Sequence, residues 1–273
     1  MSTQTTMLPR RAAAVLPLLI ACHGGRSATP APPTPSAPAV AATESSPIRG
    51  AAPFRWKGPA GSFVSIRNVN GTIRATPTTD AEAEIVAEMR DGDDGAGVVV
   101  ERTAEGVTFC VTYDAAPERT CRDRMDHSSH RHRDAVDFTV KVPQNVRFVA
   151  RTVNGAVYAQ GLTFGIDVES VNGALDLESV VDARGSTVNG SIHATFARAD
   201  WSRPVELTTV NGEVVVTFPP NTNADLRADT VHGRVPVNLP VAGQLAGSHV
   251  HTSLGTGGHD VRLRTVHGSI KVD

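Results

Sequence analysis

The chain has 273 residues, of which 40% are hydrophobic, 4% aromatic and 20% charged, and its formal net charge is -2. This balance excludes a polybasic nucleic-acid binder, and 8 Phe, 2 Tyr and 2 Trp are too few for base-stacking platforms. No apolar run reaches the roughly 18 residues of a membrane-spanning helix, whereas the length is sufficient for a folded hydrophobic core.

Residues 1–21 have the pattern of a lipoprotein signal peptide. Arg10 and Arg11 precede a short apolar stretch that ends in Leu-Ile-Ala immediately before Cys22. This ending resembles the lipobox of bacterial lipoproteins, in which cleavage leaves the cysteine as an acylated N-terminal residue. We therefore expect Cys22 to anchor the chain to a membrane, because two or three acyl chains give durable attachment. An ordinary signal peptide, with Cys22 incidental, is the alternative.

Residues 22–54 are predicted to be a tether. Seven of the 18 prolines fall between residues 23 and 53, separated mainly by Ala, Ser and Thr. Such a composition cannot bury a core and favours a semi-extended spacer. The tether would hold the following domain away from the membrane surface.

Residues 55–273 are predicted to form one β-rich domain. Its first part, residues 61–150, contains several period-2 apolar stretches but no regular repeat, so we expect it to cap the repetitive part, residues 151–273. Residues 81–89 are ambiguous between helix and strand. The highly charged residues 114–134 are predicted to be a solvated loop.

Cys110 and Cys121 are the two cysteines that remain if Cys22 is lipidated. An even pair in an exported domain predicts a disulfide, which would pin the base of the charged loop. The loop also contains three histidines and two aspartates that could ligate zinc or copper: His127, His130, His132, Asp126 and Asp134. Five arginines between residues 119 and 133 oppose cation binding, so a solvated loop without metal is the favoured interpretation.

A repeated Val-Asn-Gly or Val-His-Gly step organises the domain. Its copies place predicted structural turns at Asn70-Gly71, Asn154-Gly155, Asn172-Gly173, Asn189-Gly190, Asn211-Gly212, His232-Gly233 and His267-Gly268. From Gly155 onward the glycines are 18, 17, 22, 21 and 35 residues apart. The last interval contains a degenerate copy, residues 249–254, which keeps the Val-His step but lacks the glycine.

Two folds fit this repeat. Asn-Gly can form the two-residue turn of an antiparallel hairpin, because both residues accept a positive φ, and His is also enriched there. A hairpin would, however, align seven valines in water. A parallel β-helix or β-solenoid, with a corner at the Thr-Val step, would turn these valines inward and stack the asparagines so that their amides bond from coil to coil. We favour the all-β solenoid, with an antiparallel meander or sandwich as the alternative.

Two columns of side chains follow from parallel stacking. Five residues before each Asn or His lie Asp167, Arg184, Glu206 and Arg227, whose signs alternate as expected for neighbours on parallel strands. A second column would contain His232, His251 and His267, about 4.8 Å apart. These imidazoles could share a zinc ion or repel one another when protonated, although corner residues without a ligand remain the simpler reading.

The V-N-G-x-[IVL] repeats, the strand Phe138 to Pro143 leading to Gly155, and the closing segment Asp260 to Ile270 resemble the bacterial putative adhesin domain family of unknown function. The resemblance covers most of residues 60–273. It implies an envelope-associated protein with a β-helix-like fold. This chain departs from the pattern at His232 and His267, and at residue 252, where the glycine is missing.

No sequence motif of a hydrolase, metalloprotease, P-loop or dinucleotide-binding enzyme is present. Four acids, Asp167, Glu169, Asp176 and Glu178, are candidates for a polysaccharide lyase or hydrolase, but Arg184 lies beside them and no acid and base pair converges. We therefore expect a non-catalytic cell-envelope lipoprotein without a cofactor, which works in adhesion, scaffolding or partner binding. Its expected partners are the membrane and an envelope protein or glycan, not nucleic acid. A carbohydrate-active enzyme is the alternative.

Overall fold

The computed structural model describes residues 42–47, 52–91, 97–112, 121, 135–239 and 247–273, which all belong to one compact unit, Pro38–Asp273. The predicted signal peptide, Cys22, most of the tether and the histidines of the charged loop lie outside these residues. Every regular element of the described ranges is a β-strand, so the prediction of an all-β protein is confirmed. In these same ranges no helix is long and apolar enough to cross a bilayer.

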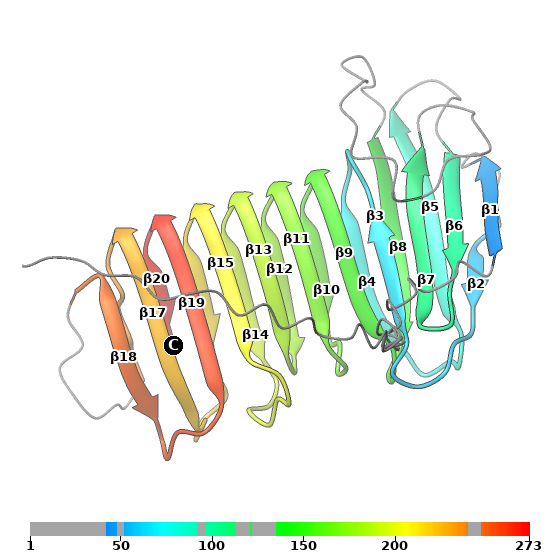
Figure 1. The fold of residues 1–273 in the computed structure, drawn as a ribbon. Helices are drawn as coiled ribbons and strands as arrows, with labels where there is room; N and C mark the ends of the chain where they lie inside the picture. The colour runs from blue at the N-terminus through cyan, green and yellow to red at the C-terminus, as the bar shows by residue number, and fades with distance from the viewer. Residues whose placement is uncertain (1–41, 48–51, 92–96, 113–120, 122–134, 240–246) are drawn as a thin grey trace, which may run out of the picture. The chain divides into compact units, whose positions relative to one another are not determined.

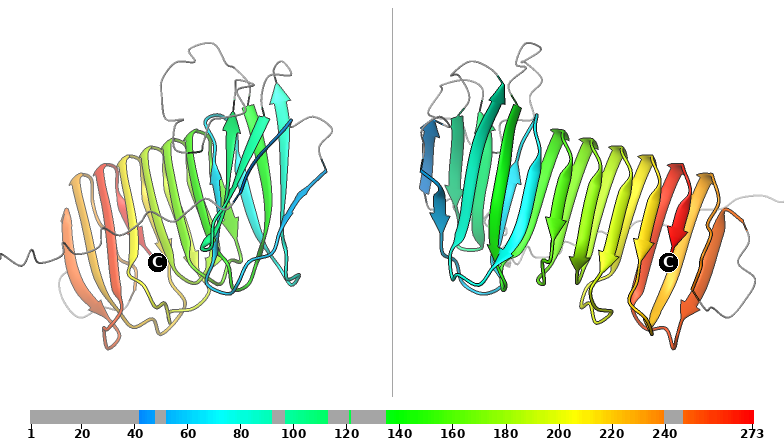
Figure 2. Two further views of the ribbon diagram at one scale, coloured as in Figure 1. Left: turned by 45° about the vertical axis from the view of Figure 1, so that its right-hand side comes forward. Right: turned by 180° about the vertical axis from the view of Figure 1, so that it is seen from behind.

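The strands form two mixed sheets (Figures 1 and 2). The eleven-stranded sheet has the spatial order β1 (Ala42–Pro47), β6 (Gly97–Arg102), β7 (Gly106–Thr112), β3 (Phe63–Arg67), β9 (Arg147–Asn154), β11 (Ile166–Asn172), β13 (Ala183–Asn189), β15 (Val205–Asn211), β19 (Asp260–His267), β17 (Ala224–His232) and β18 (His249–Leu254). The nine-stranded sheet has the order β2 (Phe54–Trp56), β5 (Ala83–Asp91), β8 (Ala135–Pro143), β4 (Ile73–Thr78), β10 (Val157–Gln160), β12 (Leu175–Val180), β14 (Ile192–Phe196), β16 (Val214–Thr217) and β20 (Ile270–Val272).

From β9 to β16, consecutive strands alternate between the two sheets. Each strand from β9 to β14 pairs in parallel with the strand that comes two later in the chain. The pairing places Asn154 beside Asn172, Asn172 beside Asn189 and Asn189 beside Asn211. We call one strand from each sheet, joined through the Val-Asn-Gly corner, a rung; in this region the motif copies lie directly over one another.

The hydrophobic core lies between the two sheets. In β11 the period-2 alternation buries Ile166 and Val168, and in β12 it buries Leu175 and Leu177. These side chains belong to one continuous cluster that includes residues from both sheets. Burying each of them contributes about 1.5–3 kcal/mol relative to exposure, so the inward-facing residues of successive rungs hold the sheets together.

The glycines of the motif are needed for close contact between rungs rather than for a left-handed backbone. A Cβ atom on any of six glycines would overlap the carbonyl oxygen of the glycine in the neighbouring rung: Gly155, Gly173, Gly190, Gly212, Gly233 and Gly268. Of these six, only Gly268 has a positive φ, and Asn221 is the single non-glycine residue with a positive φ in the described ranges. The positive φ that the hairpin alternative requires at the glycine of the Asn-Gly and His-Gly steps is therefore absent from most copies.

The valines of the motif point outward, contrary to the sequence prediction. Val171, Val188, Val210 and Val231 are 37–64% exposed, whereas the preceding Thr or Ser residues are buried. The reason is a hydrogen bond: the hydroxyl of Thr187 donates to the carbonyl oxygen of Gly173 (2.9 Å), and Thr209 bonds Gly190 in the same way (2.8 Å). A buried hydroxyl is stabilised only when it is hydrogen-bonded, and the glycine carbonyl supplies the acceptor. The outward valines therefore form an exposed stripe.

At the C-terminal end, chain order and spatial order differ. After the rung of β15 and β16, the chain does not fill the position in the sheet next to β15. It forms β17 one position further along and then β18, which pairs antiparallel with β17 at the edge. Strands β19 and β20 then fill the vacant position beside β15 and β16. The degenerate copy at residues 249–254 is consequently an antiparallel edge strand and not a stacked rung, which corrects the sequence interpretation of that segment.

At the N-terminal end, chain order and spatial order differ in the same way. The rung of β3 and β4 is followed by the antiparallel strands β5 and β6, and only then do β7 and β8 pair in parallel with β3 and β4. The ambiguous segment at residues 81–89 is thus mainly strand, since β5 buries Ala83 and Ile85 against the core.

Two short strands lie at the predicted boundary between tether and domain. Strand β1 falls wholly within residues 22–54 and pairs antiparallel with β6, and β2 begins at Phe54 and pairs antiparallel with β5. The sheets therefore begin before residue 55, where the sequence analysis placed the start of the domain. Local composition missed β1 because six residues of Ala, Thr, Glu, Ser and Pro carry no apolar alternation.

Candidate functional site

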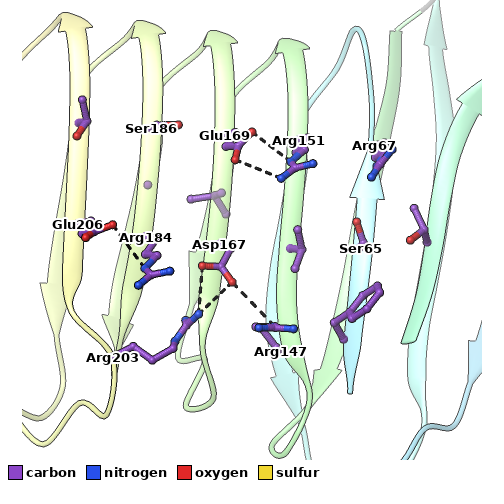
Figure 3. Close-up of a pocket in the computed structure, with 16 residues that line it drawn as sticks. Ser65, Arg67, Arg147, Arg151, Asp167, Glu169, Arg184, Ser186, Arg203 and Glu206 are labelled. Atoms are coloured by element: carbon purple, nitrogen blue, oxygen red, sulfur yellow. Dashed lines mark hydrogen bonds and ion pairs between the residues drawn. The ribbon is translucent and has the colours of Figure 1, made fainter. Parts of the chain in front are cut away.

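Two adjoining hollows on the outer face of the eleven-stranded sheet form the candidate site. The first has a volume of about 570 Å³ and crosses β7, β3, β9, β11, β13 and β15; the second, of about 430 Å³, crosses β15, β19 and β17. Eight arginines and no lysine are among the residues that line them: Arg67, Arg147, Arg151, Arg184, Arg203, Arg227, Arg262 and Arg264. We call this surface the arginine face; Figure 3 shows the first hollow.

The arginine face is also lined by carboxylates and hydroxyls. Asp167, Glu169, Glu206 and Asp229 are the four acids of the two linings, so arginines outnumber carboxylates two to one. Ser65, Thr108, Ser186 and Thr208 supply the hydroxyl groups. Period-2 alternation of the strands directs all these side chains away from the core. The face is therefore cationic although the whole chain has a net charge of -2.

The predicted charge column exists over its first three members. Asp167 lies beside Arg184, and Arg184 lies beside Glu206, with 3.6 Å between Nε of Arg184 and Oε2 of Glu206. The next residue is Arg262, 3.2 Å from Glu206, and not the expected Arg227, because β19 occupies the position between β15 and β17. Each exposed pair contributes roughly 0–1 kcal/mol, so the column sets charge pattern more than stability.

Arg203 closes one side of the first hollow. It comes from the connection between β14 and β15, and its guanidinium lies 2.8 Å from Asp182 and 3.1 Å from Asp167. Burial lowers the pKa of Arg203, but the hydrogen bond from Arg203 to Asp182 and the charges of both aspartates raise it, and the net pKa shift is upward. Arg203 therefore stays protonated and holds the connection against the sheet (Figure 3).

At two places, arginines on neighbouring strands lie directly beside each other. Arg67 of β3 pairs in register with Arg151 of β9, and Arg262 of β19 pairs in register with Arg227 of β17. Arg151 also lies 3.1 Å from Glu169, and Arg67 donates to the carbonyl oxygen of Cys121 (3.1 Å). Like charges directly opposite each other destabilise a sheet. The fold tolerates this cost at two positions on one face.

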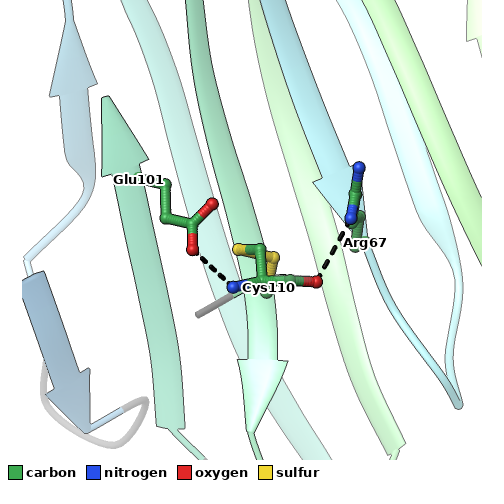
Figure 4. The surroundings of a disulfide bond; sticks show 4 residues. Arg67, Glu101 and Cys110 are labelled. Atoms are coloured by element: carbon green, nitrogen blue, oxygen red, sulfur yellow. Dashed lines mark hydrogen bonds between the residues drawn. A yellow bond between two sulfur atoms is a disulfide. The ribbon is translucent and has the colours of Figure 1, made fainter. Parts of the chain in front are cut away.

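The disulfide predicted between Cys110 and Cys121 is present, with 5.7 Å between the two Cα atoms. Cys110 lies in β7, and the bridge packs with Val99 in a small buried cluster. The backbone amide of Cys121 donates to the carboxylate of Glu101, and its carbonyl accepts from Arg67 (Figure 4). The disulfide therefore fixes Cys121 next to one end of the arginine face.

The motif asparagines form a continuous side-chain ladder. The side-chain amide of each donates to the side-chain oxygen of the asparagine in the adjacent rung at 2.8–2.9 Å, in the series Asn211, Asn189, Asn172, Asn154 and Asn70. This confirms the expected coil-to-coil amide bonds. The side-chain amides of these corners are therefore bonded to one another. The arginine face offers more polar groups for contact with a ligand.

The predicted histidine column contains two residues and not three. His267 follows Asn211 in register, and His232 stacks on His267 with 4.7 Å between ring centroids and 2° between ring planes. His251 lies instead on the antiparallel strand β18, opposite Arg227. Parallel rings direct their nitrogen lone pairs side by side, so they do not converge on one zinc at the usual 2.0–2.1 Å. In the described residues, no three His, Cys, Asp or Glu side chains form a metal-binding group.

The four acids considered for catalysis lie on opposite faces. Asp167 and Glu169 belong to β11 on the arginine face, whereas Asp176 and Glu178 belong to β12 in the nine-stranded sheet. Residues that are close in sequence are separated here because the Asn172-Gly173 corner moves the chain from one sheet to the other. The loop histidines His127, His130 and His132, with Asp126 and Asp134, lie outside the described residues.

Sequence reasoning did not identify the arginine face. Arg151, Arg262 and Arg264 precede the motif at the same offsets as the acids that were considered, and aligning all residues at these offsets would have found them. Arg67 also lies three residues before its motif asparagine, Asn70, whereas Arg203 had no such signal, because it lies in a connection of irregular length. The neighbours Arg227 and Arg262 could not be foreseen, since their contact depends on the exchanged strand order.

Comparisons with known proteins give structural likenesses only. No protein-family description matches the chain, and no curated protein matches it. A putative cell adhesion protein of Clostridium sporogenes is 11% identical, with a TM-score of 0.43 over 81% of this chain and 99% of that chain. A putative adhesin of Bacteroides fragilis is 12% identical, with a TM-score of 0.28 over 83% of this chain and 99% of that chain. Likenesses this distant transfer no ligand or activity.

Proposed function

We propose that the chain is a non-catalytic adhesion module of the bacterial cell envelope, in which a β-solenoid presents the arginine face to a binding partner. The in-register asparagine ladder supports the solenoid interpretation, because each rung repeats the same backbone path over its neighbour. The observation that carries the binding role is the arginine face itself. Seven of its eight arginines project from strands β3, β9, β13, β19 and β17 of one sheet, so their positions are set by a rigid scaffold.

The arginines of this face have the chemistry needed to bind anionic groups. A guanidinium binds carboxylate, sulfate or phosphate groups through two parallel hydrogen bonds, whereas lysine acts as a flexible point charge. Both hollows are also open to the outside of the sheet, and Phe63 is the one aromatic residue in their linings. This composition suits a polar, anionic ligand.

The same geometry weighs against the alternative of a carbohydrate-active enzyme. A glycosidase needs two carboxyl groups on the same face, about 5–10 Å apart and free to exchange protons. Asp167 is ion-paired with Arg203 and Arg147, and Glu169 is ion-paired with Arg151. Carboxylates held in this way serve the charge pattern of the face and are poorly placed to act as an acid or a nucleophile.

A bead attachment assay tests the adhesion role. Beads coated with the full chain should attach to isolated cell envelopes, and Arg151→Glu with Arg262→Glu should abolish attachment. Arg74→Glu is the matched control, because Arg74 stacks over Tyr158 on the nine-stranded sheet. Equal attachment by the double variant and wild type would contradict the proposal.

A hydrolysis and lyase screen of the same chain against polysaccharides tests the enzymatic alternative. The adhesion proposal predicts that no product forms. Product formation that is lost on Asp167→Asn or Asp176→Asn would establish catalysis and overturn the non-catalytic role. The two variants also separate the two sheets, because each removes a carboxylate from only one of them.

The lipid anchor is a separate part of the proposal and rests on the sequence around Cys22. We propose that Cys22 is acylated and holds the chain at the outer membrane or in the periplasm. Cys22→Ser should move the protein from the membrane fraction to the soluble fraction, and mass spectrometry should detect acyl chains on the wild-type N-terminal peptide alone. A membrane-bound Cys22→Ser variant would contradict lipid anchoring.

A further inference from the structure

We infer that Asn211, the last asparagine of the side-chain ladder, is a site of spontaneous deamidation, and that the ladder protects the asparagines within it from the same reaction. The site is independent of the proposed binding function, because it lies at a corner and not on the arginine face. Four steps are compared: Asn154-Gly155, Asn172-Gly173, Asn189-Gly190 and Asn211-Gly212. Asparagine is among the thermolabile residues of proteins, and a following glycine favours the reaction because it has no side chain to hinder it.

Deamidation joins the asparagine side chain to the backbone nitrogen of the following glycine. The nitrogen of Gly212 bonds to Cγ of Asn211 and gives up its proton, while the bond from Cγ to the side-chain nitrogen breaks and ammonia leaves. Water then opens the five-membered succinimide at either of its two carbonyl carbons. The products are aspartate and isoaspartate, in which the backbone runs through the side-chain carbon. The net change is amide and water to carboxyl and ammonia, without oxidation or reduction.

The fold requires this reactive pair of residues at successive corners. Glycine is needed because a Cβ atom at Gly190 would overlap the carbonyl oxygen of Gly173, and one at Gly212 would overlap that of Gly190. Asparagine suits the ladder because its side-chain amide can donate one hydrogen bond and accept another. Close stacking of the rungs therefore places a chemically labile step at each of these corners.

The hydrogen bonds of the stacked corners hold both reacting groups. The glycine amides of the four steps each donate to a backbone carbonyl of the next rung at 3.0–3.1 Å. The side chains of Asn154, Asn172 and Asn189, which we call the inner asparagines, each donate one ladder bond and accept another. A glycine nitrogen can therefore reach Cγ of an inner asparagine only after the corner opens locally.

The side chain of Asn211 has one ladder bond fewer. Its amide donates to Asn189 (2.8 Å), but its register neighbour on the other side is His267, and no residue of the described ranges donates to its side-chain oxygen. The ring of His267 stacks on His232 instead. Asn211 is also exposed to water, the second reactant. Its side chain therefore leaves its place more easily than those of the inner asparagines, although its glycine amide is bonded as theirs are.

Peptide mapping by mass spectrometry of the full chain, incubated under mildly alkaline conditions, tests the inference. Aspartate and isoaspartate should accumulate first at residue 211, about threefold to tenfold faster than at the inner asparagines, as expected for one hydrogen bond fewer. In concentrated urea the four steps should react at similar rates, because the ladder is then absent. The two conditions separate the effect of the ladder from the intrinsic reactivity of each step.

Two substitutions move the end of the ladder. His267→Asn places a side-chain amide beside Asn211 and should slow the reaction at residue 211 to the rate of the inner asparagines. Asn172→Ala interrupts the ladder and should raise the rates at both neighbouring asparagines to that of residue 211 in the wild type. Val171→Ala is the matched control, because Val171 is exposed next to Asn172 and its side chain takes no part in the ladder; all four rates should stay unchanged.

Three outcomes would overturn the inference. Equal rates at the four steps of the folded wild type would mean that position in the ladder does not control the reaction. Earlier reaction at an inner asparagine would contradict the assignment of Asn211, and an unchanged rate at residue 211 in His267→Asn would contradict protection by the ladder. The wild-type comparison needs no substitution, so it decides the question even where a variant fails to fold.

Discussion

The central rungs and the two ends of the sheets follow different rules. From β9 to β16 the chain adds one rung after another, so sequence order and spatial order agree. At each end the chain first leaves a position vacant, forms antiparallel strands at the edge, and then fills the vacancy with a parallel rung. Antiparallel strands, β1, β2 and β18, therefore form three of the four sheet edges in place of parallel rungs. The difference shows how a repetitive fold terminates itself.

The motif changes at the C-terminal end. The central corners carry asparagines joined in a hydrogen-bonded ladder, and the C-terminal corners carry the stacked imidazoles of His267 and His232. Beyond β20, the segment that follows His232 covers the sheet edge and contains Pro236, whose nitrogen cannot donate a hydrogen bond. At the C-terminal end, ring stacking thus replaces the amide ladder, whereas the N-terminal end keeps the ladder through Asn70.

Substitution of a closely packed glycine in the central rungs should cause the largest loss of stability. Gly190→Ala places a Cβ against the carbonyl oxygen of Gly173 between two fixed neighbours, so it should destabilise folding by more than about 3 kcal/mol. Gly233→Ala meets Gly268 in the same way, but the outermost parallel rung can shift, and about 1–2 kcal/mol is expected. Urea denaturation measures both; equal losses would remove the distinction between centre and end.

Removal of the disulfide should have the next largest effect on stability, and this effect should be confined to the N-terminal end. Replacing Cys110 and Cys121 together by Ser should cost about 2–4 kcal/mol, because the bridge restricts the unfolded chain. Hydrogen exchange should accelerate in β6 and β7 and remain unchanged in β13 and β15. Uniform acceleration throughout the sheets would mean that the end and the centre unfold as one cooperative unit.

Removal of a buried threonine hydroxyl from the repeat should have a smaller effect on stability, and two threonines can be compared. Thr209→Val removes a buried hydroxyl that donates to Gly190 and leaves that acceptor without its partner, which should cost about 1–2 kcal/mol. Thr152 occupies the same position where the central rungs meet the N-terminal end, but its buried hydroxyl has no hydrogen-bond partner in the described residues. Thr152→Val should therefore change stability by less than about 0.5 kcal/mol. Thermal unfolding of the two variants provides the test, and equal losses would contradict it.

The smallest effect is a pH response confined to the C-terminal end. The hydroxyl of Ser253 and the amide of Gly258 donate to Asp225 and hold the pKa of its carboxyl below the usual 3.8. A depressed folded pKa contributes stability above 3.8 that is lost as the pH falls through the lower folded value. Protease cleavage near β18 should therefore increase below this pH in wild type, whereas Asp225→Asn should cleave at a rate that does not vary there. A pH response retained in Asp225→Asn would assign it to another group.

Sequence patterns predicted the parts of the fold that depend on neighbouring residues. Period-2 alternation identified the strands, and the repeated Asn-Gly step identified corners that stack in register, because each copy contains its own apolar residues and its own glycine. The charge column of Asp167, Arg184 and Glu206 was also visible. The orientation of the valines was not, since it depends on whether the Thr hydroxyl finds an acceptor in the next rung.

Strand order at the ends, the antiparallel placement of His251 and the juxtaposition of arginines come from contacts between distant segments. Asn70 and Asn154 are neighbours although 84 residues separate them, and Arg262 meets Glu206 across 56 residues. A short stretch of chain encodes which side chains face outward, but not which other stretch will lie beside it. That choice depends on contacts between whole strands across the two sheets, and it is this choice that creates the arginine face.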